Sequence, residues 1–114
     1  MRAEQIIGDV RGRCPIVIDD MISTGGTIEA AVNALLAAGC REDILVATTH
    51  GLLVGLAGTR LSNLPIKRLL MTDSVAPRAD VTIPVQTVSL APLLARAIEG
   101  LHQGLSLDDL LAHR

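Results

Sequence analysis

The residues best suited to chemistry in this chain occupy one short stretch, in which two acids precede a run of hydroxyl residues and glycines. In chain order they are Asp19, Asp20, Ser23, Thr24, Gly25, Gly26 and Thr27. Glycine permits positive φ and lets the backbone approach a ligand closely. Successive N–H groups in such a turn, at the start of a helix, favour an anion. The turn therefore predicts a phosphate-binding site, with the hydroxyls as additional donors.

The two acids beside this turn predict a site for hydroxyl groups. Carboxylates accept hydrogen bonds, so Asp19 and Asp20 suit the vicinal hydroxyls of a sugar. Side chains alternate along a strand, so we expect only one of the two acids to contact the ligand directly. A ligand that fits both predictions carries a phosphate for the turn and hydroxyls a few ångströms away, towards the strand. Ribose 5-phosphate has this arrangement.

The residue content of the stretch argues against other kinds of ligand site. A Walker A loop needs a lysine after its last glycine, whereas Lys67 is the only lysine of the chain. The G-x-G-x-x-G dinucleotide motif is absent. Neighbouring acids on a strand seldom converge on one atom, which argues against a two-metal or aspartyl-nucleophile site. An ordinary strand–turn–helix connection with solvated carboxylates is the structural alternative.

The elements that position this stretch alternate between strands and helices. Strands are predicted at 14–18, 44–49, 66–71 and 81–88. Helices are predicted from Thr27, as N-cap, to Gly39, from Ser89 onward and after Ser106. Residues 51–63 contain three glycines and predict a loop with at most a short helix. Pro84 favours an edge position for the last strand. The order predicts a single α/β domain over 1–114, with a mainly parallel open sheet and flanking helices. We expect the apolar stripes of both long helices to lie in the core. We expect Met21 and Met71 to lie there as well.

Further polar residues follow the second and third predicted strands. Ligands of open α/β sheets bind at the carboxyl ends of the strands. His50, beside Thr49, and Asp73, between Thr72 and Ser74, are therefore possible members of the site. A structural hydrogen bond is the alternative for His50, and turn formation is the alternative for Asp73.

Composition excludes several classes of protein. Apolar residues make up 49% of the 114 residues and charged residues 19%, which excludes intrinsic disorder. The chain has no Phe, Tyr or Trp and a net charge of −2, so we expect no nucleic-acid partner. No apolar run reaches the ~20 residues of a membrane helix, and no secretory signal is recognisable. Cys14 and Cys40 lack metal-type spacing, which favours a reduced, cytoplasmic location.

The string VIDDMISTGGT, residues 17–27, resembles the phosphoribosyl-pyrophosphate signature of the type I phosphoribosyltransferase fold. Its surroundings are similar to one branch, the ribose-phosphate pyrophosphokinases. Those surroundings are Gly8-Asp9-Val10, Thr49-His50, Thr72-Asp73-Ser74 and Leu94-Ala95-Arg96-Ala97-Ile98. The resemblance extends over nearly the whole chain in the family's order.

This resemblance implies transfer of a pyrophosphoryl group from Mg-ATP to the anomeric hydroxyl of ribose 5-phosphate. By analogy, residues 23–27 hold the 5-phosphate of ribose 5-phosphate or phosphoribosyl pyrophosphate. Asp19 would bind the ribose hydroxyls, and Asp20 belongs to the same motif with a less defined contact. Mg²⁺ enters as the family's cofactor with ATP, and no metal ligand or catalytic residue of this chain is assigned.

Departures from the family pattern set further expectations. Ser23 replaces an aspartate common in bacterial and animal members, and Val54 stands where a serine is usual. The resemblance covers only the final third of the family's length. The ATP-binding N-terminal domain and the first strands of the second domain have no counterpart here, so we expect a partial domain that is inactive alone. The sheet should then have an open apolar edge that pairs with a second copy or with another synthetase chain.

Two functional alternatives stay open from the sequence. The same turn could serve a phosphoribosyltransferase of nucleobase salvage, although no base-binding hood or aromatic stack is visible. The chain could also be a non-catalytic partner of a full-length synthetase.

Overall fold

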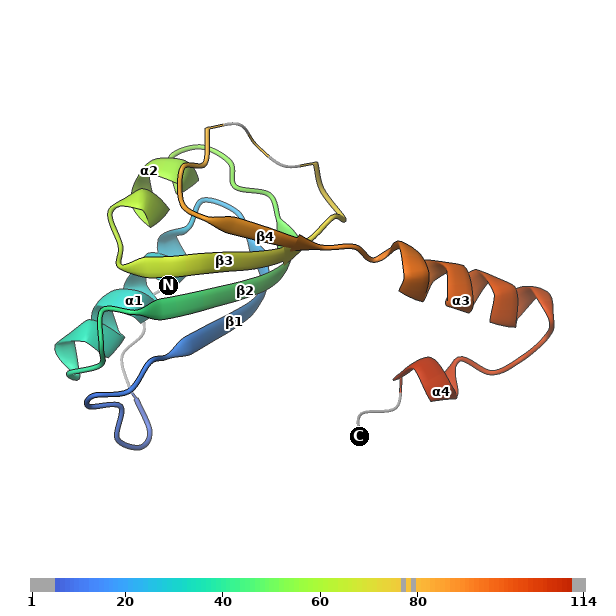
Figure 1. Ribbon diagram of the computed structural model, residues 1–114, viewed down its shortest axis with the longest axis horizontal. Coiled ribbons are helices and arrows are strands. Elements are labelled where there is room, and N and C mark those ends of the chain that lie inside the picture. The colour runs from blue at the N-terminus through green and yellow to red at the C-terminus, as the bar shows by residue number, and fades with distance from the viewer. Residues whose placement is uncertain (1–5, 77, 79, 112–114) are drawn as a thin grey trace.

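A four-stranded parallel sheet forms the main body of the molecule together with the helices on one of its faces (Figure 1). The computed structural model describes residues 6–76, 78 and 80–111. The strands, which neighbour one another in chain order, are β1 (Ile16–Ile22), β2 (Ile44–Gly51), β3 (Ile66–Thr72) and β4 (Val85–Val88). The predicted α/β class with a parallel sheet is confirmed, and β4 lies at an edge as Pro84 indicates.

Four helices complete the described part of the chain. They are α1 (Gly26–Ala37), α2 (Ala57–Ser62), α3 (Ala91–His102) and α4 (Asp108–Leu111). α1 connects β1 to β2, and α2 is the short helix expected within residues 51–63. Within the described residues, no helix has both the length and the apolar character that crossing a membrane requires.

The core lies between one face of the sheet and the two helices α1 and α2. Its fully buried members are Ile22, Ile28, Val32, Ile44, Val46, Leu53, Ala57, Leu61 and Leu69. Ile28 and Val32 come from the predicted stripe of α1, whose side chains recur every three or four residues. Burial of these aliphatic groups holds α1 and α2 against the same face of the sheet.

The opposite face of the sheet is largely uncovered. Ile18, Ala47 and Leu70 form one cross-strand row on this face, because their neighbours in sequence point towards α1 and α2. Ile18, on the edge strand β1, is 79% exposed, and Ile16 is exposed beside it. The exposed apolar edge expected from the sequence is therefore present at β1. Met21, expected in the core, is also exposed.

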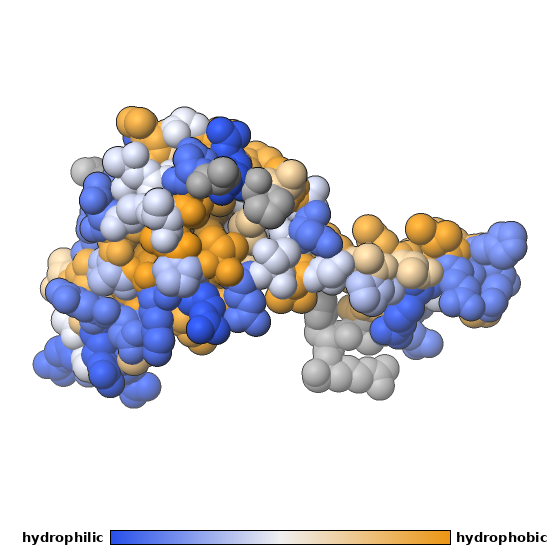
Figure 2. Space-filling model, turned by 45° about the horizontal axis from the view of Figure 1, so that its top comes forward, coloured by the Kyte–Doolittle hydropathy of each residue, from blue (hydrophilic) through white to orange (hydrophobic). Residues whose placement is uncertain are grey.

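α3 extends away from the sheet beyond the end of β4 (Figure 1). Its apolar stripe, which includes Leu94, Ile98 and Leu101, contains no buried residue, and Ile98 is 68% exposed. Figure 2 shows hydrophobic side chains at the surface of this extension. The expectation that the stripe is core is wrong, because the other described elements do not bury any of its side chains. The amphipathic pattern did predict the helix itself.

Two strand boundaries differ from the predicted ones. β1 was expected to end at Ile18 but continues to Ile22, because its backbone pairs with β2 as far as Gly51. β4 was expected from Val81 but begins at Val85, directly after Pro84, which has no N–H to donate to the sheet. The first correction matters for the site, since it places both acids inside a strand.

Candidate functional site

A concave pocket lies at the carboxyl end of β1, where the chain turns into α1. Its lining residues are Asp19, Met21, Ile22, Ser23, Thr24, Gly25, Gly26, Thr27 and Ile28. The cavity has a volume of about 160 Å³, which is smaller than the roughly 300–1,000 Å³ typical of drug-sized ligand sites. The structure thus brings together six of the predicted site residues, Asp19 and residues 23–27.

Gly25 gives the turn its shape. It has φ +84° and ψ 0°, in the left-handed region that glycine adopts without strain, and it is the N-cap residue of α1. Gly26 has no positive φ and begins the helix. The predicted N-cap, Thr27, is wrong: Thr27 lies within the first turn, and no side chain caps the helix. The first-turn amides of α1 therefore have no helical carbonyl to bind, and the helix dipole favours an anion there.

The two acids of β1 have different surroundings. Asp19 is half-buried and lines the pocket, whereas Asp20 is exposed and does not line it. The Asp19 carboxylate accepts a hydrogen bond from the Asp20 amide at 2.8 Å. Alternation along β1 separates the two side chains, as predicted. Asp19 is therefore the acid that can reach a sugar bound in this pocket.

His50 belongs to a hydrogen-bonded group outside the pocket. It is the penultimate residue of β2, and its Nδ1 lies 2.8 Å from Ser74 Oγ. Ser74 Oγ also donates to the Thr49 carbonyl at 3.3 Å, and Thr72 donates to the same carbonyl. These contacts tie the ends of β2 and β3 together. His50 does not line the pocket beside Asp19.

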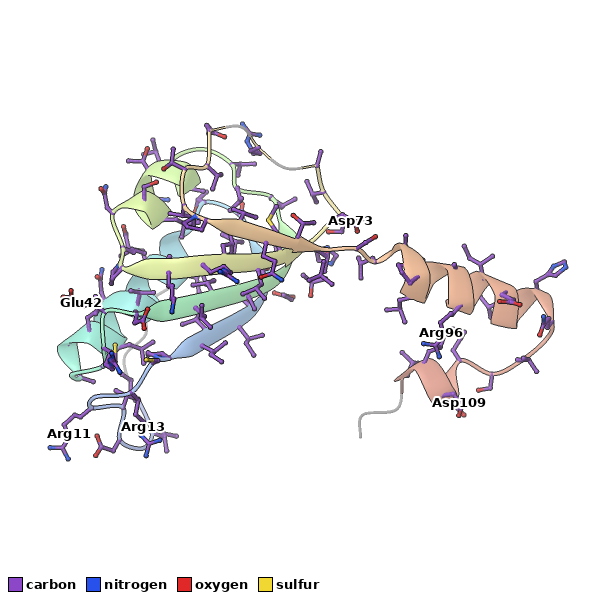
Figure 3. The ribbon with its side chains drawn as sticks, in the orientation of Figure 1. Arg11, Arg13, Glu42, Asp73, Arg96 and Asp109 are labelled. Atoms are coloured by element: carbon purple, nitrogen blue, oxygen red, sulfur yellow. The ribbon has the colours of Figure 1, made fainter. Side chains whose placement is uncertain are left out.

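Asp73 connects the end of β3 to the start of α3 (Figure 3). Its carboxylate accepts hydrogen bonds from the Leu90 amide at 2.8 Å and from Ser89 Oγ at 2.7 Å. The Leu90 amide and then the Ser89 hydroxyl lower the pKa of Asp73 from its ordinary value of 3.8. Asp73 also does not line the pocket. Its contacts anchor the beginning of α3.

The anchoring of α3 by Asp73 should depend on pH. A lowered pKa means that the interaction is complete above the ordinary value of 3.8 and is lost as the pH falls through the lower folded value. We expect a carbon-13 NMR titration of the Asp73 carboxyl to have a midpoint below 3.8. Ser89→Ala should move that midpoint upward, because one donor is removed. A wild-type midpoint at or above 3.8 would contradict these contacts.

Sequence reasoning missed a segment, residues 52–60, whose amides and one side chain donate hydrogen bonds to carbonyls at the end of β1 and in the turn. The Leu52 and Leu53 amides donate to the Ile22 carbonyl at 3.0 and 3.1 Å. The Val54 amide donates to the Ser23 carbonyl, and Arg60 Nη1 donates to the Thr24 carbonyl at 2.8 Å. No local motif marks these residues. Only their place after the neighbouring parallel strand could have suggested them.

The described residues do not fit a resident metal ion. Within residues 6–76, 78 and 80–111, no three His, Cys, Asp or Glu side chains are grouped so that they could hold one. Asp19 and Asp20, the adjacent acids, are on opposite faces of β1. A magnesium ion at this pocket would need ligands from elsewhere, such as phosphate oxygens.

Comparison with known proteins places this geometry in a family. The family model described as "Phosphoribosyl synthetase-associated domain" matches residues 3–112. A ribose-phosphate pyrophosphokinase of Streptomyces coelicolor is 43% identical over 95 residues, covering 82% of this chain and 29% of the relative. One from Rhodopirellula baltica is 39% identical over 116 residues, covering 100% of this chain and 36% of the relative.

A solved structure supports the same assignment. The crystal structure of phosphoribosylpyrophosphate synthetase from Mycobacterium smegmatis is similar, with a TM-score of 0.81 and 37% identity over 91% of this chain and 35% of that one. The expected type I phosphoribosyltransferase-like fold is thereby confirmed. The chain spans about a third of the length of these relatives. It belongs to the family of phosphoribosyl synthetase-associated domains and is a relative of the ribose-phosphate pyrophosphokinases.

Proposed function

We propose that the pocket at the end of β1 binds ribose 5-phosphate, or the phosphoribosyl part of phosphoribosyl pyrophosphate. The observation that supports this most strongly is the presence of Asp19 and residues 23–27 in one pocket. The free amides at the start of α1 would bind the phosphate, and Asp19 would accept hydrogen bonds from the ribose hydroxyls. Charge-assisted hydrogen bonds of this kind contribute about 1.5–3 kcal/mol each.

The proposed role in catalysis follows from the relatives' printed name, ribose-phosphate pyrophosphokinase. Such an enzyme converts ATP and ribose 5-phosphate to AMP and phosphoribosyl pyrophosphate. In our proposal this chain supplies the sugar-phosphate site, while the ATP site and the magnesium that accompanies ATP belong to other residues. We therefore expect no turnover of ATP and ribose 5-phosphate by these 114 residues alone.

Isothermal titration calorimetry tests the binding proposal. The folded chain should bind ribose 5-phosphate more tightly than either ribose or inorganic phosphate, because each of these satisfies only part of the pocket. No binding of ribose 5-phosphate to a sample with the expected far-UV circular dichroism would refute the proposal. Release of pyrophosphate from phosphoribosyl pyrophosphate and a purine or orotate would favour nucleobase salvage instead.

Replacing Asp19 with asparagine should weaken this binding about tenfold, since the charged acceptor for the ribose hydroxyls is lost. Calorimetry with ribose 5-phosphate measures the change. Asp20→Asn makes the same chemical change on the opposite face of β1 and should alter the affinity less than twofold. Equal losses in the two variants would contradict the assignment of the hydroxyl site to Asp19.

We further propose that the uncovered apolar surfaces of this chain pair with a second copy. The row of Ile18, Ala47 and Leu70 and the stripe of α3 are both apolar. Ile18 and the stripe residues Leu94, Ile98 and Leu101 are exposed in the single molecule. In a twofold dimer the α3 of each copy could cover the open sheet face of the other, which buries both surfaces. Co-purification with a full-length synthetase, without self-association, would favour the partner alternative.

Ile18→Asp should disrupt this pairing, because it places a charge in the buried surface of the dimer. We expect the dissociation constant of the dimer to rise at least about tenfold. Light scattering coupled to size-exclusion chromatography measures the mass at several concentrations. Ile7→Asp is the matched control, since Ile7 is 91% exposed and lies outside the sheet. A dimer equally stable in both variants would contradict pairing through the sheet face.

A further inference from the structure

Three successive carbonyls of the binding turn are held from one side by residues 52–60. The Ile22 carbonyl accepts from two backbone amides of this segment, and the Ser23 carbonyl accepts from the Val54 amide at 2.9 Å. The third, the Thr24 carbonyl, accepts from a side chain, Arg60 Nη1 at 2.8 Å. The other donors to these carbonyls are backbone amides, which almost any residue would supply. The hydrogen bond from Arg60 is the one that requires a particular side chain.

Holding a carbonyl also orients the next amide. In a trans peptide the C=O and the N–H that follows it point in opposite directions. The Thr24 carbonyl and the Gly25 N–H belong to one peptide, so a carbonyl fixed on Arg60 directs the Gly25 N–H away from Arg60. The pocket is lined by residues of β1, the turn and the start of α1, and no residue of the segment 52–60 is part of its lining.

α2 is placed so that Arg60 can act in this way. Arg60 is half-buried on α2, and this helix packs directly against the turn. A Cβ atom built on Gly25 would lie 3.6 Å from Ala57 Cα and 3.8 Å from Arg60 Cβ. The contact between the turn and α2 is therefore close, and the guanidinium is the group that bonds the turn's carbonyl.

We propose that Arg60 is a positioning residue of the phosphate site: it holds the Thr24 carbonyl so that the Gly25 amide faces the pocket. The inference rests on the proposed binding of a sugar phosphate by this turn. Arg60 acts through the turn, and its contribution is the orientation of an N–H donor.

Arg60→Met tests the proposal, because methionine keeps an unbranched apolar stem and removes every donor. We expect the affinity for ribose 5-phosphate, measured by calorimetry, to fall about tenfold. We also expect the Gly25 amide signal in a nitrogen-15 NMR spectrum of the ligand-free protein to move. Arg41→Met is the matched control: Arg41 is exposed, and its loss changes the net charge equally. It should change the affinity less than twofold and leave the Gly25 signal in place.

Arg60→Lys provides the conservative variant, since the ammonium keeps both the charge and a donor. We expect it to bind ribose 5-phosphate within about threefold of wild type and to serve as the test if Arg60→Met does not fold. An affinity loss in Arg60→Met with an unmoved Gly25 signal would overturn the proposal in favour of direct contact with the phosphate. An unmoved signal with unchanged affinity would also overturn it. If wild type fails to bind ribose 5-phosphate, the proposed function fails, while the Gly25 signal still tests the positioning role.

Discussion

Gly25→Val is expected to weaken binding of ribose 5-phosphate at least about a hundredfold. Gly25 has φ +84°, and a left-handed conformation costs an L-residue roughly 1–2 kcal/mol, more for a β-branched one. Its Cβ would point towards α2 and lie in van der Waals contact with Ala57 and Arg60, which leaves little room for the two methyl groups beyond it. The turn must then change conformation, and the amides of the phosphate site move with it.

The physical reason why position 25 needs a glycine differs from the reason that the sequence suggests. The sequence favours a glycine here so that a ligand can approach the backbone, but the missing side chain would point towards α2. Backbone strain and the contact with α2 therefore make glycine necessary at this position. Calorimetry with ribose 5-phosphate measures the effect, and far-UV circular dichroism establishes that the variant is folded.

Gly104→Val is the matched control for Gly25→Val. Gly104 has φ +71° and no atom within 4 Å of a built Cβ, so valine there carries the same backbone strain without a close neighbour and outside the pocket. It should leave the affinity for ribose 5-phosphate within about twofold of wild type. A Gly25→Val variant that is folded and binds normally would contradict the whole assignment of the phosphate site.

Leu69→Ala is expected to have the largest effect on stability. Leu69 lies in β3, is 0% exposed, and shares a cross-strand row with Val46 and Val85. Truncating a fully buried leucine costs about 2–5 kcal/mol, and the sheet on both sides cannot collapse into the cavity. In a domain whose total stability is roughly 5–15 kcal/mol, this would leave a substantial unfolded fraction.

Urea unfolding followed by far-UV circular dichroism measures this loss. The chain has no Phe, Tyr or Trp, so intrinsic fluorescence is not an option. Leu56→Ala makes the same truncation at Leu56, which is 64% exposed and belongs to neither apolar surface of the proposed dimer, and it should change the free energy of unfolding by less than about 0.5 kcal/mol. A Leu69→Ala loss below about 1 kcal/mol would show that the core differs from the one described.

Much of the site could be predicted from local sequence because its parts are contiguous. The turn and the acid that lines the pocket lie within nine residues of one another, and period-two alternation along β1 separates Asp19 from Asp20. The strand and helix types followed from apolar runs and from the stripe of α1. Boundaries were less predictable: Asp19 and Asp20 were expected to follow the strand, whereas pairing with β2 extends β1 through them.

Long-range contacts account for what local patterns missed. His50 and Asp73 lie at the expected edge of the sheet, but hydrogen bonds to Ser74, Ser89 and the Leu90 amide connect them to other elements. The stripe of α3 is as amphipathic as that of a core helix, yet amphipathicity does not identify the surface that covers it.

The sequence by itself determined a parallel α/β fold and a glycine-containing turn with an acid beside it, because both depend on residue types at fixed short spacing. The tertiary structure alone decided which acid enters the pocket's lining, which glycine needs a positive φ, and that Arg60 holds the Thr24 carbonyl. Arg60 is 36 residues from Thr24 in sequence. The two meet because β1 and β2 are parallel neighbours that end at the same edge of the sheet. The segment that follows β2 therefore lies next to the turn that follows β1.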